Sequence, residues 1–266
     1  MSDLDRIVTA VSGARKYRSV CAETIRRIAD DEMANHDDLK TAIKATKRRL
    51  HQAYGAFEWR LDYDTAYGRL ELAYETGLKT EIKAASRDVL SLHSSTRERL
   101  PLLDRFYVEI FQVTGQPGSL LDLGCGLNPL ALPWMGLPAA TRYTPIDIDV
   151  ERIGFLNRYL ALAERQPLAR CQDVLVQPPP EADVALLLKM SPSLERQASG
   201  ATLRLMDQIS APFVVVSYAI KSLGGREKGM LDHYERQFQE LAADRNWSVT
   251  RLIFETELVF VVERRT

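Results

Sequence analysis

The chain has 266 residues, of which 45% are hydrophobic and 27% are charged, and its formal net charge at pH 7 is −1. This composition is ordinary for a globular protein with one large domain, or with a core domain and a smaller one. The near-zero net charge gives no overall sign of nucleic-acid binding.

The cysteines and the apolar runs bear on metals and membranes. Cys21, Cys125 and Cys171 are scattered without the spacing of metal ligands or of a disulfide framework, so we expect no metal and a reducing compartment. No apolar run approaches the roughly 20 residues that a membrane-spanning helix needs, and the N-terminus lacks the apolar segment of a signal peptide. We expect a cytoplasmic protein without a membrane partner.

The first part of the chain has a helical pattern. Apolar residues recur at three- and four-residue spacing in the segments 20–33, 37–54, 63–76, 79–91 and 96–113. This period is typical of amphipathic helices. The pattern changes near residue 117, so an all-helical N-terminal domain is predicted over residues 1–115.

From residue 116 on, short apolar runs alternate with helical segments. Strands are predicted at about 119–123, 142–147, 169–175, 183–189 and 212–218, with helices at 150–165, 194–209 and 229–243. This alternation is typical of a parallel sheet covered by helices. Two further strands, Trp247 to Phe254 and Glu257 to Arg264, are joined by a short turn. We therefore predict a Rossmann-like α/β domain over residues 116–266, with a mostly parallel sheet that ends in an antiparallel hairpin.

The most informative motif lies where the first of these strands ends. The apolar strand Leu120–Leu123 runs into Gly124-Cys125-Gly126, and Asp147 follows about twenty residues later, at the end of the next strand. Glycines let the backbone approach a ligand without a Cβ clash. A carboxylate at the tip of the second strand can accept both hydroxyls of a ribose. These features predict a nucleoside site.

The same motif argues against a dinucleotide. A dinucleotide site uses a third glycine at the start of a helix to hold a pyrophosphate, but here Asn128-Pro129 follows the turn. Asp122, just before the turn, would repel a phosphate and attract a cationic amine. A positively charged nucleoside without phosphates fits better, and S-adenosylmethionine (SAM) is the common one. The sequence thus predicts the fold of a SAM-dependent methyltransferase.

The residues after the fourth strand bear on the methyl acceptor. Enzymes that methylate adenine N6 usually carry an Asn/Asp-Pro-Pro-aromatic motif there, whereas Lys189–Ser193 contains neither an amide nor an aromatic side chain. Cytosine-C5 methylation needs a cysteine nucleophile, and none of the three cysteines is well placed for it. The acceptors that remain are already nucleophilic, such as a ring nitrogen or the amine of a small molecule or a protein.

Positive charge is concentrated near the N-terminus. Residues 1–50 contain 11 Lys and Arg against 8 Asp and Glu, although the whole chain carries −1. The candidates for phosphate contacts are Arg15, Lys16, Arg18, Arg26, Arg27, Lys47, Arg48 and Arg49. If these side chains share a face, they form an electrostatic footprint for RNA. On charge alone, solvated helix faces are the more common interpretation.

Three blocks of the sequence resemble those of one known family. They are Ser91–Leu100, Asp122–Leu132 and Ser222–Met230, and they follow the family's order over nearly the whole chain. The family is the aminoglycoside-resistance 16S rRNA (guanine-N7) methyltransferases, which modify guanosine 1405 in the decoding site of the small ribosomal subunit. The first and third blocks are far more specific than the glycine turn, which most SAM enzymes share.

The resemblance implies SAM as the cofactor, 16S rRNA in the 30S subunit as the partner, and a set of site residues. Arg99 would pair with the methionine carboxylate of SAM. Asp147 would hold the ribose, while Asp173 and Val174 would meet the adenine. The implied cofactor-binding residues are Phe57, His93, Ser94, Ser95, Arg99, Gly124, Asp147, Asp173, Val174, Leu188 and Gln197.

The resemblance also bears on the target base. The loop Lys221–Met230 is the candidate for gripping a flipped guanine, with Lys221, Arg226 and Lys228 as RNA-binding residues. Guanine N7 carries an in-plane lone pair and loses no proton, so no catalytic acid or base is expected. Catalysis would consist of holding N7 in line with the methyl group, at about 3–3.5 Å.

Other functions remain compatible with the residues. A SAM-dependent methyltransferase with this site could act on another rRNA nucleotide. It could also act on a small molecule, in which case the basic N-terminus would be dispensable. A ribosome-binding module that has lost catalysis would associate with ribosomes but lack affinity for SAM.

Overall fold

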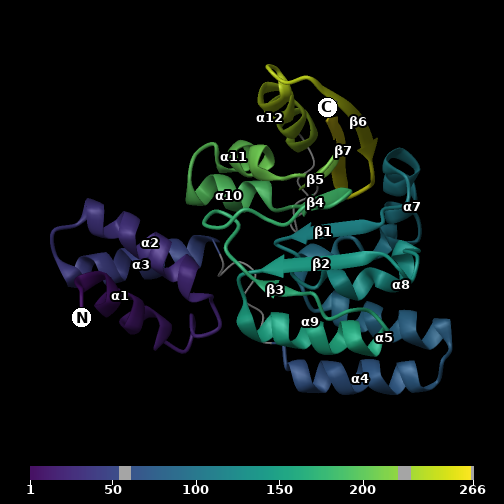
Figure 1. Ribbon diagram of the computed structural model, residues 1–266, viewed down its shortest axis with the longest axis horizontal. Coiled ribbons are helices and arrows are strands. Elements are labelled where there is room, and N and C mark those ends of the chain that lie inside the picture. Colours follow the sequence, from purple (N-terminus) through teal and green to yellow (C-terminus); the bar gives the residue numbers. More distant parts are fainter. Residues whose placement is uncertain (54–60, 221–228, 265–266) are drawn as a thin grey trace.

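The computed structural model describes residues 1–53, 61–220 and 229–264. Figure 1 shows a central sheet flanked by helices, with three N-terminal helices to one side. The predicted site residues Phe57, Lys221, Arg226 and Lys228 lie outside the described residues. Within the described part of the chain, no helix is both long enough and apolar enough to cross a membrane.

The sheet has seven strands in the order β3-β2-β1-β4-β5-β7-β6. They are β1 (Ser119–Leu123), β2 (Arg142–Asp147), β3 (Arg170–Cys171), β4 (Val184–Leu188), β5 (Phe213–Ala219), β6 (Trp247–Ile253) and β7 (Glu257–Arg264). The first five run parallel, whereas β7 lies antiparallel to both β5 and β6. The predicted Rossmann-like arrangement with a C-terminal antiparallel hairpin is confirmed.

Of the helices in the described residues, the first three stand beside the sheet and the others lie around its two faces. The helices are α1 (Asp3–Ser12), α2 (Ala22–Asn35), α3 (Leu39–Ala53), α4 (Tyr63–Glu75), α5 (Lys79–Ser91), α6 (Ser94–Arg97), α7 (Leu103–Thr114), α8 (Leu132–Met135), α9 (Val150–Leu162), α10 (Ser191–Gln197), α11 (Ala201–Gln208) and α12 (Met230–Ala242), with 3-10 turns at Leu100–Leu102 and Asn128–Ala131. Alternate strand residues point to opposite faces. Leu120 and Leu186 therefore pack with α4, α5, α7, α8 and α9, while Leu121 and Leu187 pack with α10, α11 and α12.

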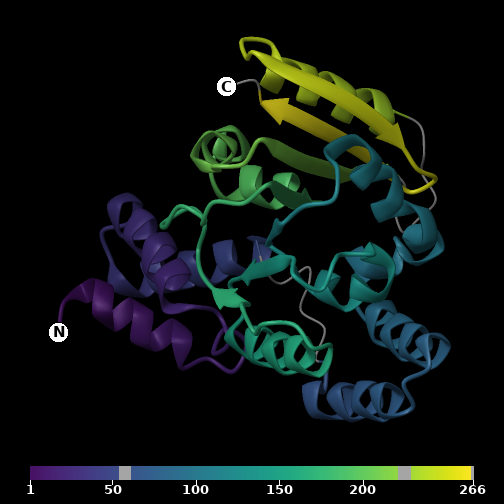
Figure 2. The ribbon, with the colours of Figure 1, turned by 45° about the vertical axis from the view of Figure 1, so that its right-hand side comes forward.

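Helices α1 to α3 form a separate group, which we call the N-terminal helix unit. Its core contains Ile7, Val11, Ile25, Ile28 and Leu50, and the unit stands beside the sheet in both views (Figures 1 and 2). The backbone segment before α2 ties it to the end of β2. There the Cys21 N–H donates to the Ile148 carbonyl at 2.8 Å, and the Val150 N–H donates to the Ser19 carbonyl at 2.7 Å.

The helices that precede β1 do not share one hydrophobic core. Leu70 of α4, Val89 of α5 and Phe106 of α7 belong to the same core as the sheet, not to the core of the N-terminal helix unit. The domain boundary predicted at residue 115 therefore does not coincide with a change in packing. The amphipathic period shows that a helix buries one face, but it does not show which partner that face meets.

Several element boundaries also differ from the prediction. Helix α1 was not predicted, although Ser2 and Asp5 form a capping box at its start. The helix predicted over 194–209 is two helices, because Gly200 adopts a positive φ of 70° between them. Strand β3 ends at Cys171, since the next residues turn and the Val176 N–H donates to the Asp173 carbonyl at 2.9 Å.

The packing of α4 can be tested by core truncation. Leu70→Ala should lower the free energy of unfolding by about 2–5 kcal/mol, because the side chain is fully buried against the sheet's core. Leu72→Ala on the same helix should change it by less than about 0.5 kcal/mol, since Leu72 is 65% exposed. Denaturant unfolding followed by circular dichroism measures both, and similar small losses for the two variants would show that α4 is detached from the core.

Candidate functional site

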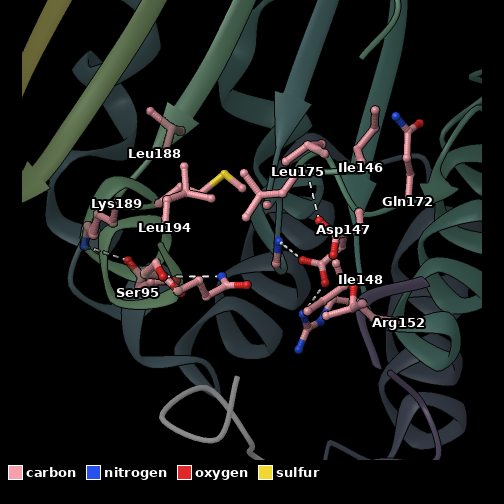
Figure 3. A pocket seen from close by; sticks show the side chains of 18 of the residues that line it. Ser95, Ile146, Asp147, Ile148, Arg152, Gln172, Leu175, Leu188, Lys189 and Leu194 are labelled. Carbon is pink, nitrogen blue, oxygen red and sulfur yellow. Dashed lines mark hydrogen bonds and ion pairs between the residues drawn. The ribbon is translucent and has the colours of Figure 1, made fainter. Parts of the chain in front are cut away.

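A cavity opens at the carboxyl ends of β1, β2 and β4 (Figure 3). Ligands of open α/β sheets bind at this edge, where the strand order reverses between β1 and its two neighbours. Eight of the residues predicted to bind the cofactor line the cavity: His93, Ser95, Gly124, Asp147, Asp173, Val174, Leu188 and Gln197. The fold therefore brings these residues, which lie far apart in the sequence, to one cavity.

The glycine turn after β1 forms one wall of this cavity. Gly124 and Gly126 both have positive φ angles, of 59° and 53°. A Cβ atom on Gly124 would come within 2.9 Å of the Met190 Sδ. The positive φ angles are what require glycine in this turn, since the flexible Met190 side chain could move away from a Cβ, and the turn presents backbone to a ligand.

Asp147 is held in a fixed orientation at the end of β2. Its Oδ2 accepts the Gly126 N–H at 2.9 Å, and its Oδ1 accepts the Asp149 N–H at 3.1 Å and the Arg152 Nη1 at 3.0 Å. A carboxylate offers about four lone-pair positions. One acceptor position therefore remains for a hydroxyl group on the ligand, and Figure 3 shows the carboxylate beside the cavity.

The far end of the cavity combines apolar walls with a second carboxylate. Ile146, Leu175 and Leu188 form part of these walls. Asp173 accepts the Leu175 N–H at 2.9 Å through Oδ1, while its Oδ2 accepts the Arg27 Nε at 2.9 Å. An apolar slot with a carboxylate at its edge suits a planar base that carries an amino group.

Two arginines that were predicted to bind RNA lie in internal contacts. The Arg27 Nη2 donates to the Gln197 Oε1 at 2.7 Å, so Arg27 links Gln197 to Asp173 across the cavity. Arg49 pairs with Asp31 and Glu32 and also donates to the Gln197 carbonyl at 2.8 Å. Both guanidinium groups thus fasten the N-terminal helix unit to α10 and are not part of an open basic surface.

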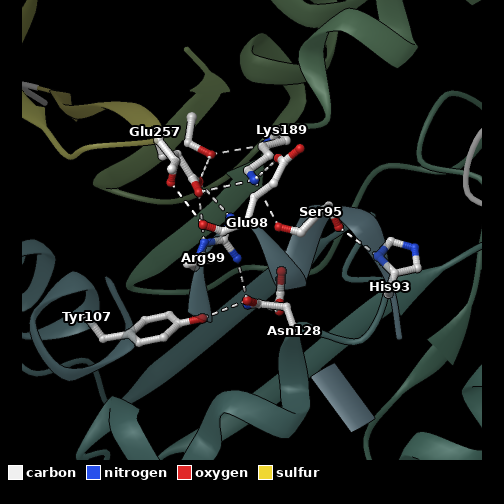
Figure 4. Close-up of polar contacts among 11 residues, drawn as sticks. His93, Ser95, Glu98, Arg99, Tyr107, Asn128, Lys189 and Glu257 are labelled. Atoms are coloured by element: carbon white, nitrogen blue, oxygen red, sulfur yellow. Dashed lines mark hydrogen bonds and ion pairs between the residues drawn. The ribbon is translucent and has the colours of Figure 1, made fainter. Parts of the chain in front are cut away.

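Arg99, predicted to hold the methionine carboxylate, does not line the cavity. It is 3% exposed, and its guanidinium donates to both carboxylate oxygens of Glu257, at 3.0 and 2.6 Å, and to the Asn128 Oδ1 at 2.8 Å (Figure 4). Three of the five N–H donors of Arg99 are therefore used by partners inside the protein. The assignment stays a prediction, as do those of Ser94, which lies outside the cavity lining, and Phe57.

A second buried cation joins this cluster. The Lys189 Nζ donates to the Ser95 carbonyl at 2.9 Å and to Glu98 at 2.8 Å, and it lies 3.5 Å from Glu257 (Figure 4). Burial raises the pKa of Glu257, but the positive charges of Arg99 and Lys189 outweigh it and hold that pKa below its ordinary value. Glu257 is therefore ionised at neutral pH, and the cluster ties β7 to the cavity.

Two charged residues of the cavity lining were missed by sequence reasoning. Lys189 lines the cavity with an uncommon positive φ of 57°, directly after β4, and Arg152 lines it from the first turn of α9. Their positions carried a signal, because each charge follows closely on a strand whose carboxyl end was expected at the site.

His93 and Asp122 have pKa values that their surroundings shift. Burial, reinforced by the charge of Arg152, lowers the pKa of His93 to about 4, so the imidazole is neutral at pH 7. Burial raises the pKa of Asp122 to about 6. Asp122 does not line the cavity, because its Oδ2 accepts from Asn128 and Tyr143 within the core. Its expected role in attracting a cationic amine by direct contact is therefore not seen.

The other predicted RNA-binding cations lie on the N-terminal helix unit. Arg18 pairs with Glu151, Arg26 pairs with Asp5, and the Lys16 Nζ lies 2.9 Å from the His51 Nδ1. Arg15 and Arg48 are exposed, and Lys47 is half-buried. Along α3, Lys40, Lys44 and Arg48 are exposed at a spacing of four residues, which places them on one helix face.

The fold and the cavity together define a class of protein. The sheet is mostly parallel and ends in a C-terminal hairpin. At the carboxyl ends of its strands lie a glycine turn, the Asp147 carboxylate at the tip of β2, and an apolar slot with the Asp173 carboxylate at its edge. These residues fit the ribose and base of SAM, and the site lacks a third turn glycine to hold a pyrophosphate. The chain is a SAM-dependent methyltransferase.

Comparison with known proteins gives the family. A family described as "Ribosomal RNA methyltransferase (FmrO)" matches residues 13–261, and the chain belongs to it. A Micromonospora echinospora protein named 16S rRNA (guanine(1405)-N(7))-methyltransferase is 40% identical over 98% of this chain and 97% of its own. A Serratia marcescens protein of the same name is 33% identical over 98% of this chain and 99% of its own.

Solved structures agree with this family over the full length. The 16S rRNA methyltransferase RmtF in complex with S-adenosyl-L-homocysteine (SAH) superposes with a TM-score of 0.83, at 35% identity, covering 100% of this chain and 99% of that one. The 16S rRNA methylase RmtB superposes with a TM-score of 0.79, at 28% identity, covering 98% of both chains.

The buried cluster of Arg99, Lys189 and Glu257 predicts a large loss of stability when its carboxylate is replaced by an amide. Glu257→Gln should lower the free energy of unfolding by about 3–5 kcal/mol, because it leaves Arg99 buried without its counter-charge. Glu255→Gln, which breaks a half-exposed pair with Arg105, should cost at most about 1 kcal/mol. Denaturant titration of the two variants and the unchanged chain provides the measurement, and equal losses would contradict the assigned role of Glu257.

Proposed function

We propose that this chain transfers the methyl group of SAM to N7 of guanosine 1405 in 16S rRNA, within the assembled 30S subunit, and thereby confers aminoglycoside resistance. The observation that carries the proposal is the cavity at the sheet's carboxyl edge in a chain that matches proteins named for this reaction over nearly its whole length. A ribosomal substrate also supports a cytoplasmic location.

Different residues of the cavity contact different parts of SAM. Asp147 accepts a hydrogen bond from a ribose hydroxyl, while the Asp173 carboxylate and the Val174 backbone meet the edge of the adenine between Ile146 and Leu188. Gly124 gives the cofactor close access to the backbone. His93 and Ser95 lie toward the methionine end, where the Ser95 hydroxyl and the His93 Nδ1 are 2.8 Å apart.

The reaction asks for positioning, not for proton transfer. SAM supplies an electrophilic methyl group on a sulfonium, and guanine N7 attacks with a lone pair that carries no proton. His93 is neutral at pH 7, so it adds no positive charge beside the sulfonium. The protein contributes by aligning the two groups and excluding water.

The N-terminal helix unit is the proposed docking surface for rRNA. The exposed face of α3 carries Lys40, Lys44 and Arg48, and Arg15 adds a further exposed charge. Such cations contact phosphates and read the shape of folded RNA without reading base edges. Because the same unit is fastened to the cavity through Arg27 and Arg49, docking there fixes the position of the methyl donor.

The cofactor assignment predicts a specific loss of affinity. Asp147→Asn should weaken SAH binding by roughly 10- to 100-fold, because a hydrogen bond to a charged group contributes about 1.5–3 kcal/mol. Asp183→Asn is the matched control, since Asp183 also accepts a backbone N–H but lies at the opposite edge of the sheet. Isothermal calorimetry with SAH measures both, and equal affinities for the two variants would remove Asp147 from the cofactor site.

The docking assignment predicts a loss that spares the cofactor. The double variant Lys44→Glu and Arg48→Glu should reduce transfer of labelled methyl groups from SAM to 30S subunits at least tenfold, while SAH affinity stays unchanged. Lys79→Glu, an exposed lysine of α5, should leave transfer within about twofold. Full transfer by the double variant, or equal transfer to protein-free 16S rRNA, would contradict docking through this face.

A further inference from the structure

Two cysteines meet where the N-terminal helix unit joins the sheet. Cys21 lies at the start of α2, and its backbone is bonded to Ile148; Cys171 ends β3 and pairs with Asp147. Since Ile148 follows Asp147 directly, both cysteines lie against the same end of β2. Their thiols are in hydrogen-bonding contact with each other, and the Cys21 Sγ also lies 3.0 Å from the Thr24 Oγ1.

The surroundings give the two thiols different reactivity. The hydrogen bond from Cys171, against the opposing effect of burial and with help from Thr24, lowers the pKa of Cys21 to about 7. The thiolate is the nucleophilic form, so this downward shift makes Cys21 the attacking thiol of the pair. The same contact and burial raise the pKa of Cys171, which keeps its proton and is half-buried.

The third cysteine serves as an internal contrast. Cys125 lies within the glycine turn, is fully enclosed, and has a pKa that burial raises well above its ordinary value. Within the described part of the chain, its thiol donates to the Gly126 carbonyl and makes no hydrogen bond to either of the other thiols. Reactivity is therefore concentrated in the pair formed by Cys21 and Cys171.

We propose that Cys21 and Cys171 form a redox modification site, which a hydroperoxide converts into a disulfide that fastens the N-terminal helix unit to β3. The Cys21 thiolate attacks the peroxide and breaks its O–O bond, giving a sulfenic acid and hydroxide, which takes up a proton to become water. The Cys171 thiol then displaces the sulfenic oxygen as a second water. Two thiols are oxidised and one hydrogen peroxide is reduced to two waters, and a dithiol reverses the change.

A disulfide between Cys21 and Cys171 would lie beside residues that line the cofactor cavity. Thr24, which contacts the Cys21 sulfur, lines the cavity, and so does Asp173, two residues beyond Cys171. Arg27 of α2 already joins Asp173 by an ion pair at 2.9 Å. A covalent bond at the same junction would lock the orientation of the basic docking helices relative to the cofactor cavity.

The test uses the full chain, hydrogen peroxide, and the variants Cys21→Ser, Cys171→Ser and Cys125→Ser. After denaturation and alkylation, the three thiols of the unchanged chain should fall to one on oxidation, and peptide mass mapping should join Cys21 to Cys171. Cys125→Ser should lose both of its remaining thiols. Cys21→Ser should keep both of its thiols at the same peroxide dose, because the attacking thiolate is gone. Cys171→Ser should lose one of its two thiols as the sulfenic acid of Cys21, and peptide mass mapping should find no disulfide in it.

A second readout separates a bond within the chain from other oxidation. The oxidised chain should remain monomeric on non-reducing gels and should unfold at a temperature several degrees higher, with dithiothreitol restoring the original value. The same shift is expected in Cys125→Ser and not in Cys21→Ser. Three remaining thiols, a bond that includes Cys125, or a link only between chains would overturn the proposal. None of these readouts depends on methyl transfer, so they are independent of the proposed function.

Discussion

The carboxylate of Asp147 is the point on which the functional part of this structure depends. It accepts hydrogen bonds from the glycine turn after β1, from the backbone of Asp149 and from Arg152 of α9. Three segments are thus fixed around one buried group at the end of β2. The N-terminal helix unit attaches to the next residue along, Ile148, so the same strand end also sets the position of the basic helices.

A second constraint comes from buried charge. Arg99 and Lys189 share Glu257, which is fully buried, and the Ser217 hydroxyl donates to the same carboxylate at 2.5 Å. Buried charges are costly unless each one is paired and hydrogen-bonded. This cluster therefore holds β5, β7 and the segment around α6 in one arrangement, with Lys189 and Ser95 at the wall of the cavity.

Much of the fold could be predicted from local sequence, because strands and turns have local signatures. The apolar run Leu120–Leu123, the Gly124 turn and the tip residue Asp147 are placed as expected, since glycine conformation and strand period do not depend on distant contacts. The partner of an amphipathic helix is not a local property. Residues 61–114 were therefore grouped with the N-terminal helices, although α4, α5 and α7 pack on the sheet.

The roles of the charged residues were also hard to predict, because they depend on partners that lie far away in the sequence. Arg27 and Arg49 looked like surface cations because their partners, Asp173 and Gln197, lie about 150 residues away in the chain. Arg99 looked like a ligand contact, and in the structure it is bonded to Glu257, a residue that no sequence signal had linked to it. Burial and pairing decide what a charge does, and both are set by tertiary contacts.

The cavity is proposed to deliver a methyl group to one ring nitrogen of ribosomal RNA. The most direct test is to incubate 30S subunits with the protein and SAM, treat the extracted 16S rRNA with borohydride and aniline, and map strand breaks by reverse transcription. We expect scission at guanosine 1405, dependent on SAM and absent from untreated subunits. Intact rRNA at that position, under conditions where calorimetry shows SAM bound, would contradict the claim and leave the fold and cofactor site standing.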